Sequence, residues 1–172
     1  MIEMTKDNIA RILEAFAYIA ENITFNKKNN MYNVLKVFYL ADKLHMDRYG
    51  RFIFEDKYAA LPKGPVPSRA YDLMKNIKTG QPLPHGLTSP IHLESNYNVL
   101  ADRKANLDYF SGSDLICIDE VINISKNKDL GSLSHDNAWK NTSPNQIMTT
   151  ESILSTLENS KELIHLYKNR YA

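Results

Sequence analysis

Asp42 and His45 are the side chains best placed for acid–base or metal chemistry, because both are polar within a segment of apolar residues at helical spacing. They are three residues apart and would be neighbours on one helix surface. A helical projection puts His45 within the apolar arc and Asp42 near its edge. A buried carboxylate is costly without a partner. For Asp42 that partner would be His45, a tyrosine hydroxyl, Lys63, Arg69 or loop N–H groups.

This pair has two alternative roles. In one, Asp42 and His45 form half of an acid–base or metal site. In the other, Asp42 ties the loop at Gly64-Pro65 to the helix, and His45 is a hydrogen-bonded imidazole of the core. The structural alternative is favoured, because two ligands are too few for a metal ion. The other histidines lack ligand spacing, so no metal and no cofactor is predicted; they are His85, His92 and His165.

His135 and Trp139 are four residues apart and would stack on one helical face. Trp139 could anchor a protein partner, since aromatic residues concentrate binding energy at interfaces. Alternatively, Trp139 fills the core and His135 donates a hydrogen bond to a nearby carbonyl. The second alternative is the simpler one.

The tetrapeptide Gly64-Pro65-Val66-Pro67 predicts a stiff turn that leads into a helix at Val66-Pro67. It lacks the spacing of a phosphate-binding loop, and its prolines offer no N–H to an anion. A stiff turn would lose little entropy on docking while it holds four side chains in a constant relation: Lys63, Ser68, Arg69 and Tyr71. The turn is therefore either a recognition element or only a rigid helix start.

No nucleophile stands out in the sequence. The single cysteine, Cys117, lies in an apolar helical run and is predicted to be a small buried hydrophobic residue. No Gly-x-Ser-x-Gly elbow is present. The sequence therefore predicts a protein that is not an enzyme.

The elements that must position these residues are mostly helical. The predicted fold class is mainly α, with one small antiparallel β-sheet or hairpin inserted after the second and third helices. On the second helix, Lys36, Lys43 and Asp47 are expected on a solvated face. Phe52–Phe54 and Tyr58–Leu61 are expected to be extended, and a hairpin is expected at 91–101. The predicted helices are the stripe from Ile9 to Ile23, Met31–Arg48, one from Val66, one capped at Ser111 or Ser113 and reaching Asn127, Leu130–Trp139, and a last region from Thr149 or Thr150 that bends near Asn159-Ser160.

Length and composition favour one soluble domain over residues 1–172. With 21 basic and 20 acidic residues the net charge is +1, so no broad field attracts nucleic acid or anionic lipid. No signal peptide is visible, and no apolar run reaches the ~20 residues that span a bilayer. We therefore expect a cytoplasmic protein without membrane or nucleic-acid partners.

Several short motifs in one order resemble the Panacea domain, also known as the SocA-like antitoxin domain. The resemblance covers residues 34–139. Its first part is made of Tyr39-Leu-Ala-Asp42, Tyr49-Gly50, Tyr58-Ala59-Ala60, Gly64-Pro65-Val66-Pro67 and Tyr71. Its second part is Leu133-Ser134-His135 with Trp139, in which Ser134 replaces the usual threonine and keeps the hydroxyl.

The resemblance implies the antitoxin half of a bacterial or phage toxin–antitoxin pair. Such a protein would neutralise a protein toxin encoded nearby by direct contact. Two alternatives are an adaptor that delivers the toxin to a protease and an enzyme that reverses the toxin's product, using Asp42, His45 and His135. The resemblance also implies that the signature residues matter for the partner; they are Tyr39, Asp42, His45, Tyr58, Lys63, Pro65, Pro67, Arg69, Tyr71, His135 and Trp139. Because a single helix precedes the signature, the DNA-binding segment of some relatives is not expected.

Overall fold

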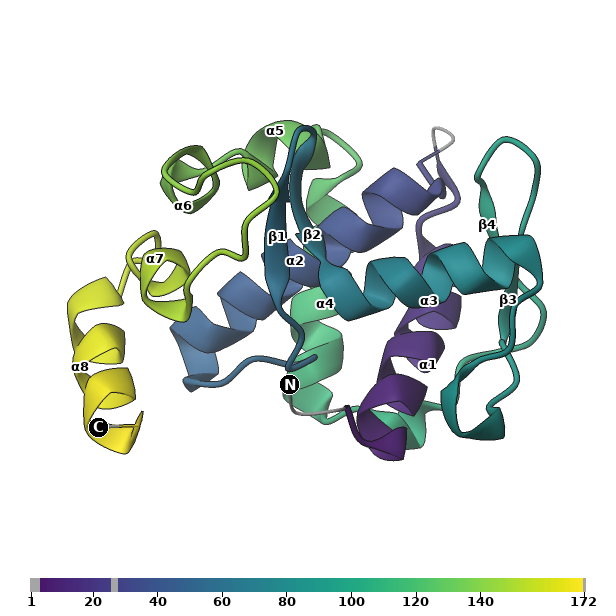
Figure 1. The fold of residues 1–172 in the computed structure, drawn as a ribbon, viewed down its shortest axis with the longest axis horizontal. Helices are drawn as coiled ribbons and strands as arrows, with labels where there is room; N and C mark the ends of the chain where they lie inside the picture. The colour runs from purple at the N-terminus through teal and green to yellow at the C-terminus, as the bar shows by residue number, and fades with distance from the viewer. Residues whose placement is uncertain (1–3, 26–27, 172) are drawn as a thin grey trace.

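Helices form most of the molecule, as the sequence predicted. The computed structural model describes residues 4–25 and 28–171 (Figure 1). The helices are α1 (Lys6–Asn22), α2 (Met31–Tyr49), α3 (Ser68–Thr79), α4 (Gly112–Ile124), α5 (Leu130–Ser134), α6 (Asn137–Lys140), α7 (Thr150–Leu154) and α8 (Ser160–Tyr171). The strands form two antiparallel hairpins, β1 (Tyr58–Leu61) with β2 (Gly64–Pro67) and β3 (Ile91–Leu93) with β4 (Val99–Ala101).

The core forms where the apolar faces of α1, α2 and α4 meet. Thr5 caps α1 by accepting a hydrogen bond from the Asn8 N–H, and Gly50 ends α2 in the left-handed conformation, with φ of 76°. Phe16 and Phe38 pack together with ring centroids 5.4 Å apart. Cys117 of α4 is buried in this core, as predicted.

Helix α2 is the element that most others contact. It packs against α1, α3, α4, α5 and β2, and it passes behind the β1–β2 hairpin in Figure 1. Lys36 lies on α2 and is only 1% exposed, so its predicted place on a solvated face is wrong. Lys43 and Asp47 are partly exposed. The Lys36 side chain instead faces the hairpin.

The predicted stiff turn at Gly64–Pro67 is wrong, because these residues form strand β2. Each strand residue has a partner, from Tyr58 opposite Pro67 to Leu61 opposite Gly64. The turn itself is Pro62-Lys63, and α3 begins at Ser68, not at Val66. Phe52–Phe54 form bends and not a strand, whereas Tyr58–Leu61 are extended as predicted. The β3–β4 hairpin is confirmed.

Strand β1 has a second neighbour that the sequence did not predict. Ala60 donates to the Gln146 carbonyl, and its own carbonyl accepts from Asn145. Met148 donates to the Tyr58 carbonyl. The segment 145–148 therefore lies along the edge of β1 opposite β2.

The region predicted as one helix from Leu130 to Trp139 is two short helices. Helix α5 ends at Ser134, and α6 starts at Asn137. Asp136 interrupts the helix because its side chain caps α6, accepting a hydrogen bond from the Trp139 N–H at 3.0 Å. The predicted break near Asn159-Ser160 is confirmed, since α7 and α8 are separate there.

Helix α3 has an N-terminal cap that comes from outside the helix. Its N-cap position is Pro67, whose side chain makes no cap hydrogen bond. Asp56 takes that role, accepting from Arg69 N at 3.0 Å and from Ala70 N at 2.9 Å. It also accepts from Lys57 N at 2.7 Å. One carboxylate thus joins the segment before β1 to the start of α3.

Replacing Asp56 with alanine is expected to destabilise the protein by about 1–2 kcal/mol, because three main-chain N–H groups lose their acceptor. Thermal unfolding would show this as a fall in Tm of about 2–4 °C per kcal/mol for a chain of this size. Asp72→Ala is the control, since Asp72 lies on the same helix in an exposed ion pair with Lys75. It should change stability by less than about 0.5 kcal/mol. Equal effects of the two substitutions would contradict the capping role.

Candidate functional site

Four side chains donate hydrogen bonds to main-chain carbonyls around the tip of the β1–β2 hairpin. They come from α2, from the end of α5 and from α6, so three separate elements converge on one turn. We call these four residues the hairpin clamp. Its members are Tyr32, Lys36, His135 and Trp139.

The Lys63 carbonyl is the centre of the hairpin clamp. It accepts from the Tyr32 hydroxyl at 3.1 Å and lies 3.0 Å from His135 Nε2. Because a carbonyl only accepts, Nε2 of His135 must carry the proton in this contact. On either side, Lys36 Nζ donates to the Pro65 carbonyl at 2.6 Å and Trp139 Nε1 donates to the Leu61 carbonyl at 2.8 Å.

The prolines of β2 explain why one of these donors, Lys36, is needed. Tyr58 and Ala60 direct their main-chain groups to the 145–148 segment, so Pro67 and Pro65, which lie opposite them, sit at positions that do not bond to β1. Proline is tolerated there because it lacks an N–H. The Pro65 carbonyl still requires a donor. Lys36 supplies it.

Two glycines make room for the hairpin clamp. A Cβ on Gly64 would lie 2.7 Å from Lys36 Nζ and 2.9 Å from His135 Cδ2. Gly64 also has φ of 116°, a conformation that side-chain-bearing residues avoid. A Cβ on Gly131 would collide with the Tyr32 hydroxyl. The donors therefore reach the turn only because these two positions carry no side chain.

Burial makes the ammonium group of Lys36 easier to deprotonate. Desolvation lowers the pKa of its ammonium group to about 8. The ammonium also lies 5.1 Å from the centroid of the Tyr32 ring, a favourable cation–π contact.

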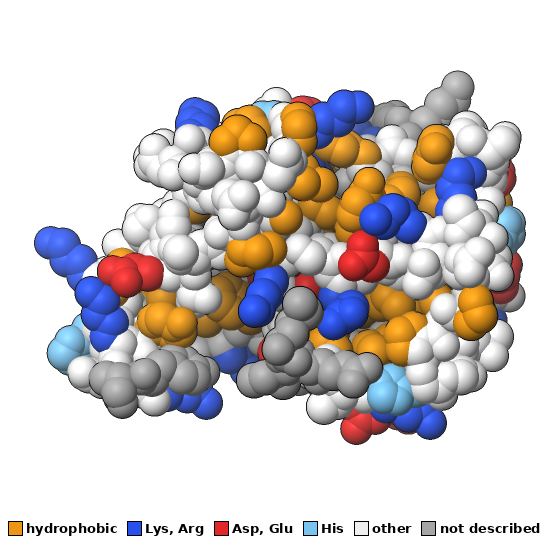
Figure 2. Space-filling view, viewed as in Figure 1, with side chains coloured by type: hydrophobic (Ala, Val, Ile, Leu, Met, Phe, Trp, Pro, Cys, Tyr) orange, Lys and Arg blue, Asp and Glu red, His pale blue; other side chains and the backbone are white. Residues whose placement is uncertain are grey.

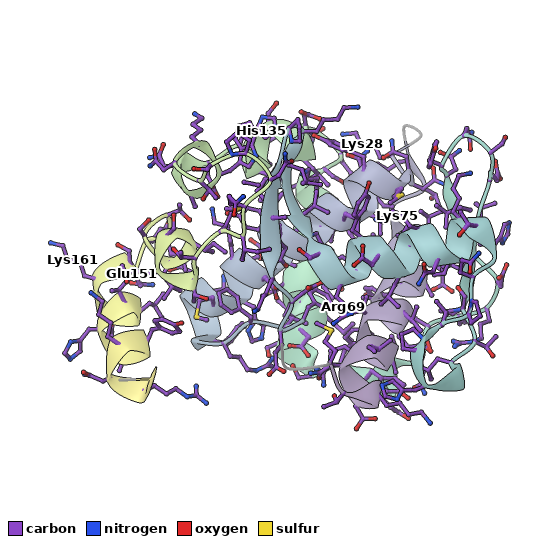
Figure 3. The ribbon with its side chains drawn as sticks, in the orientation of Figure 1. Lys28, Arg69, Lys75, His135, Glu151 and Lys161 are labelled. Carbon is purple, nitrogen blue, oxygen red and sulfur yellow. The ribbon has the colours of Figure 1, made fainter. Side chains whose placement is uncertain are left out.

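His135 and Trp139 stack on each other, as predicted, although they do not share a helix: His135 follows α5, and Trp139 lies in α6. Their ring centroids are 4.3 Å apart and the planes are 17° from parallel. Both side chains are half-buried. The prediction that His135 donates to a nearby carbonyl is confirmed. Figure 3 shows His135 beside the tip of the hairpin.

Asp42 is buried and holds the chain between α2 and β1. Its Oδ1 accepts from Ile53 N at 2.7 Å and Phe54 N at 3.3 Å, and its Oδ2 accepts from the Tyr58 hydroxyl at 2.6 Å. The expected tyrosine and loop N–H partners are confirmed. The expected tie to the Gly64-Pro65 segment is wrong. Burial raises the pKa of Asp42 to about 7, against the three hydrogen bonds that lower it.

A second carboxylate, Asp136, repeats this arrangement at the hairpin clamp. Its Oδ2 accepts from the Tyr39 hydroxyl at 2.6 Å and from Lys43 Nζ at 2.8 Å. Burial raises the pKa of Tyr39. The ring of Tyr39 packs edge-on against Tyr58, with centroids 5.0 Å apart. Asp42 and Asp136 are thus linked through two tyrosines that join α2, β1 and the start of α6.

His45 belongs to the core and not to the Asp42 network. Its Nδ1 lies 2.9 Å from the Arg51 carbonyl, and its Nε2 lies 2.9 Å from Ser113 Oγ and 3.3 Å from Asp114 Oδ1. In a Ser-His-Asp triad the serine and the carboxylate contact opposite ring nitrogens, whereas here they share one. Burial lowers the pKa of His45. The expected core imidazole is confirmed, and Asp42 is not its partner.

Arg69 and Tyr71 lie outside the hairpin clamp, and Lys63 contacts it only through its carbonyl. Arg69 lies at the other end of the hairpin, where α3 begins (Figure 3). Tyr71 packs partly against the main core, with Lys75 Nζ 4.5 Å from its ring centroid. Lys63 contributes its carbonyl, while its side chain is exposed.

The part of the chain that the structure describes contains no group of three His, Cys, Asp or Glu side chains that could hold a metal ion. Burial raises the pKa of the Cys117 thiol. None of the described helices is long and apolar enough to cross a bilayer.

Comparison with known families decides where the chain belongs. The family model described as the Antitoxin SocA-like, Panacea domain matches residues 34–140, well over half of the 172 residues. The chain belongs to the SocA-like Panacea antitoxin family. This membership supports a general antitoxin role with a toxin as partner. No curated protein and no solved structure matches the chain.

Several residues of this Panacea site were not found from the sequence. Lys36 and Tyr32 were missed because their acceptors are carbonyls about thirty positions away. Asp136 was missed although it follows His135 directly. One feature of the sequence indicates the role of Asp56. A helix preceded by proline lacks a side-chain cap at that position, so another residue must supply the acceptor.

Gly64→Ala is expected to lower the free energy of unfolding by about 2–4 kcal/mol, because it adds both left-handed strain and a clash with Lys36 and His135. Gly80→Ala is a matched control, since Gly80 has φ of 72° and nothing within 4 Å of an added Cβ. It should cost only about 1 kcal/mol. Urea denaturation would compare the two. An equal loss of unfolding free energy in both variants would mean that an added Cβ at residue 64 does not clash with Lys36 and His135.

Asp42 should make folding less favourable as pH rises. With a folded pKa of about 7 and an ordinary unfolded pKa, the folded protein holds a proton that the unfolded chain has released between these values. Between pH 5 and 8 the stability of the wild type relative to Asp42→Asn should therefore fall by roughly 3 kcal/mol. Denaturation of both proteins across this range measures the difference. A difference that is constant or grows with pH would show that Asp42 is ionised in the fold at pH 5.

Proposed function

We propose that the chain neutralises a protein toxin by binding it directly through the tip of the β1–β2 hairpin and the neighbouring faces of His135 and Trp139. The observation that carries this proposal is the hairpin clamp. Four side-chain donors are directed at the main chain of a turn whose own side chains, Pro62 and Lys63, are exposed.

The physical argument is preorganisation. Ordering one residue on binding costs about 1–2 kcal/mol of backbone entropy. The hairpin clamp orders the turn when the protein folds, so this entropy is not lost again when a partner binds. The Lys63 side chain makes no hydrogen bond or ion pair within the described part of the chain. Its charge is therefore available to a partner.

The surface around the tip also has the composition of a binding site. Hydrophobic side chains gather over the β1–β2 hairpin in the view of Figure 2, with lysine and arginine side chains among them. The stacked pair of His135 and Trp139 adds a half-buried aromatic face beside the tip. Tryptophan is among the residues that most often contribute a large share of the binding energy at an interface.

Lys63→Glu tests this proposal without disturbing the hairpin clamp, because only the Lys63 carbonyl takes part in it. The toxic protein encoded beside the gene is the ligand. Lys63→Glu should weaken its binding roughly tenfold or more, measured by titration calorimetry, and should reduce rescue of growth in cells that express the toxin. Lys57→Glu is the control, since Lys57 is an exposed lysine near the base of the same hairpin.

Equal binding by Lys63→Glu and the wild type would contradict contact through the tip. If the wild type protects cells without binding the toxin, neutralisation by direct binding is wrong. Protection that requires a protease would favour the adaptor alternative.

A further inference from the structure

A second surface, which we call the α2–α4 groove, lies between these two helices. It has a volume of about 260 Å³. Sites for small molecules are usually larger, at about 300–1,000 Å³. The groove therefore suits side chains of a polypeptide better than a whole ligand. Its walls are aliphatic and comprise Leu40, Leu44, Val121, Ile124, Leu133 and Leu157.

Part of this aliphatic lining is exposed to water. Ile124 is 36% exposed and Leu133 is 39% exposed. Leu40 and Leu44 are half-buried, whereas Val121 and Leu157 form the floor. Covering such a surface with another apolar group is favourable.

The secondary structure around the groove limits what can fill it. Leu40, Leu44, Val121 and Ile124 come from α2 and α4, in which the main-chain N–H and C=O groups are already bonded within the helices. A β-strand binds by pairing with free main-chain groups at a sheet edge. These helices offer no such groups, so a β-strand cannot pair with them. Recognition must come from side chains. An amphipathic helix that lays its apolar face into the groove meets this condition.

The charges at the rim favour a basic occupant. Lys43 is neutralised by Asp136, with Nζ 2.8 Å from Oδ2. Asp47 accepts only neutral donors from Asn159, and Glu158 makes no hydrogen bond or ion pair with any described residue. Two negative charges thus remain at the rim. Lysine or arginine flanking the apolar face of the occupant would pair with them.

The groove is close to the proposed contact at the hairpin. Asp136 binds both Tyr39 beneath the hairpin clamp and Lys43 at the groove rim. Leu133 precedes His135 by two residues on the same turn of chain. One partner could therefore cover both surfaces.

We propose that the α2–α4 groove binds an amphipathic helix of the toxin, with aliphatic residues spaced i and i+4 on one face and lysine or arginine beside them. This inference rests on the proposed function and adds a second contact to it. The toxin helix would enter the groove between Ile124 and Leu133. Its basic residues would lie against Asp47 and Glu158.

The test uses the full chain and the purified toxic protein encoded beside its gene. The double variant Ile124→Gln/Leu133→Gln removes the exposed apolar wall and should weaken toxin binding roughly tenfold or more, measured by calorimetry. Ile116→Gln is the matched control, because Ile116 lies on the same helix, is 54% exposed and does not line the groove. It should bind as the wild type does.

Glu158→Lys provides an independent test that does not depend on core packing, since Glu158 is exposed. It should weaken binding and reduce the salt dependence of the affinity. Synthetic peptides covering each amphipathic helix of the toxin should include one with basic flanks that binds the wild type, becomes helical on binding and binds the double variant more weakly.

The outcomes separate the two proposals. If the toxin binds the wild type and all groove variants equally, the groove proposal is wrong while direct neutralisation stands. If the toxin does not bind the wild type, both proposals fail. A change in the oligomeric state of the double variant alone, seen by light scattering, would assign the groove to a second copy of the chain and overturn the proposal.

Discussion

The structure depends on how carbonyl groups at the β1–β2 hairpin obtain hydrogen-bond donors. Strand β2 contains two prolines, so its outer side carries carbonyls without matching N–H groups. A buried carbonyl without a donor would cost about 1–3 kcal/mol. Lys36 of α2 removes that cost at the Pro65 carbonyl. The other members of the hairpin clamp donate to the neighbouring carbonyls of Lys63 and Leu61. The same bonds hold the exposed turn in one conformation, so the requirement of the strand and the requirement of a recognition surface are met together.

The buried charges of this region follow from the same arrangement. Helix α2 carries both Lys36 and Asp42. Lys36 donates to a carbonyl of the hairpin, and Asp42 accepts from main-chain N–H groups of the segment before β1. Each is buried, and burial moves each pKa toward neutrality. Tyr39 and Tyr58 then connect Asp42 with Asp136 through their packed rings. Breaking one partner of such a network leaves a buried polar group unpaired, which is why its members act as a unit.

Local patterns in the sequence predicted most of the helices, the β3–β4 hairpin and the burial of Asp42, because these depend on periodicity and turn residues. They did not predict that Asp136 divides the helix expected from Leu130 to Trp139. Local patterns did not predict the contacts between segments that are distant in the sequence. Lys36 was assigned to solvent from its helical projection, whereas its acceptor lies 29 residues away. The Gly-Pro sequence at Gly64-Pro65 predicts a turn, whereas Gly64–Pro67 pair with β1 as a strand. The sequence does not show that the 145–148 segment bonds the main-chain groups of Tyr58 and Ala60 that β2 leaves unpaired. Asp42 was assigned to the wrong loop because several segments offered suitable donors.

Native-state hydrogen exchange tests the central claim most directly, through the hairpin amides of Gly64 and Val66, which lie opposite Leu61 and Ala59. If the hairpin clamp holds the turn, these amides exchange nearly as slowly as those of α2 in the wild type. Trp139→Phe, which keeps a ring for stacking on His135 but removes the donor to Leu61, should then accelerate them selectively while α2 stays protected. Fast exchange of the hairpin amides in the wild type, or no change on Trp139→Phe, would contradict a turn ordered by side-chain donors.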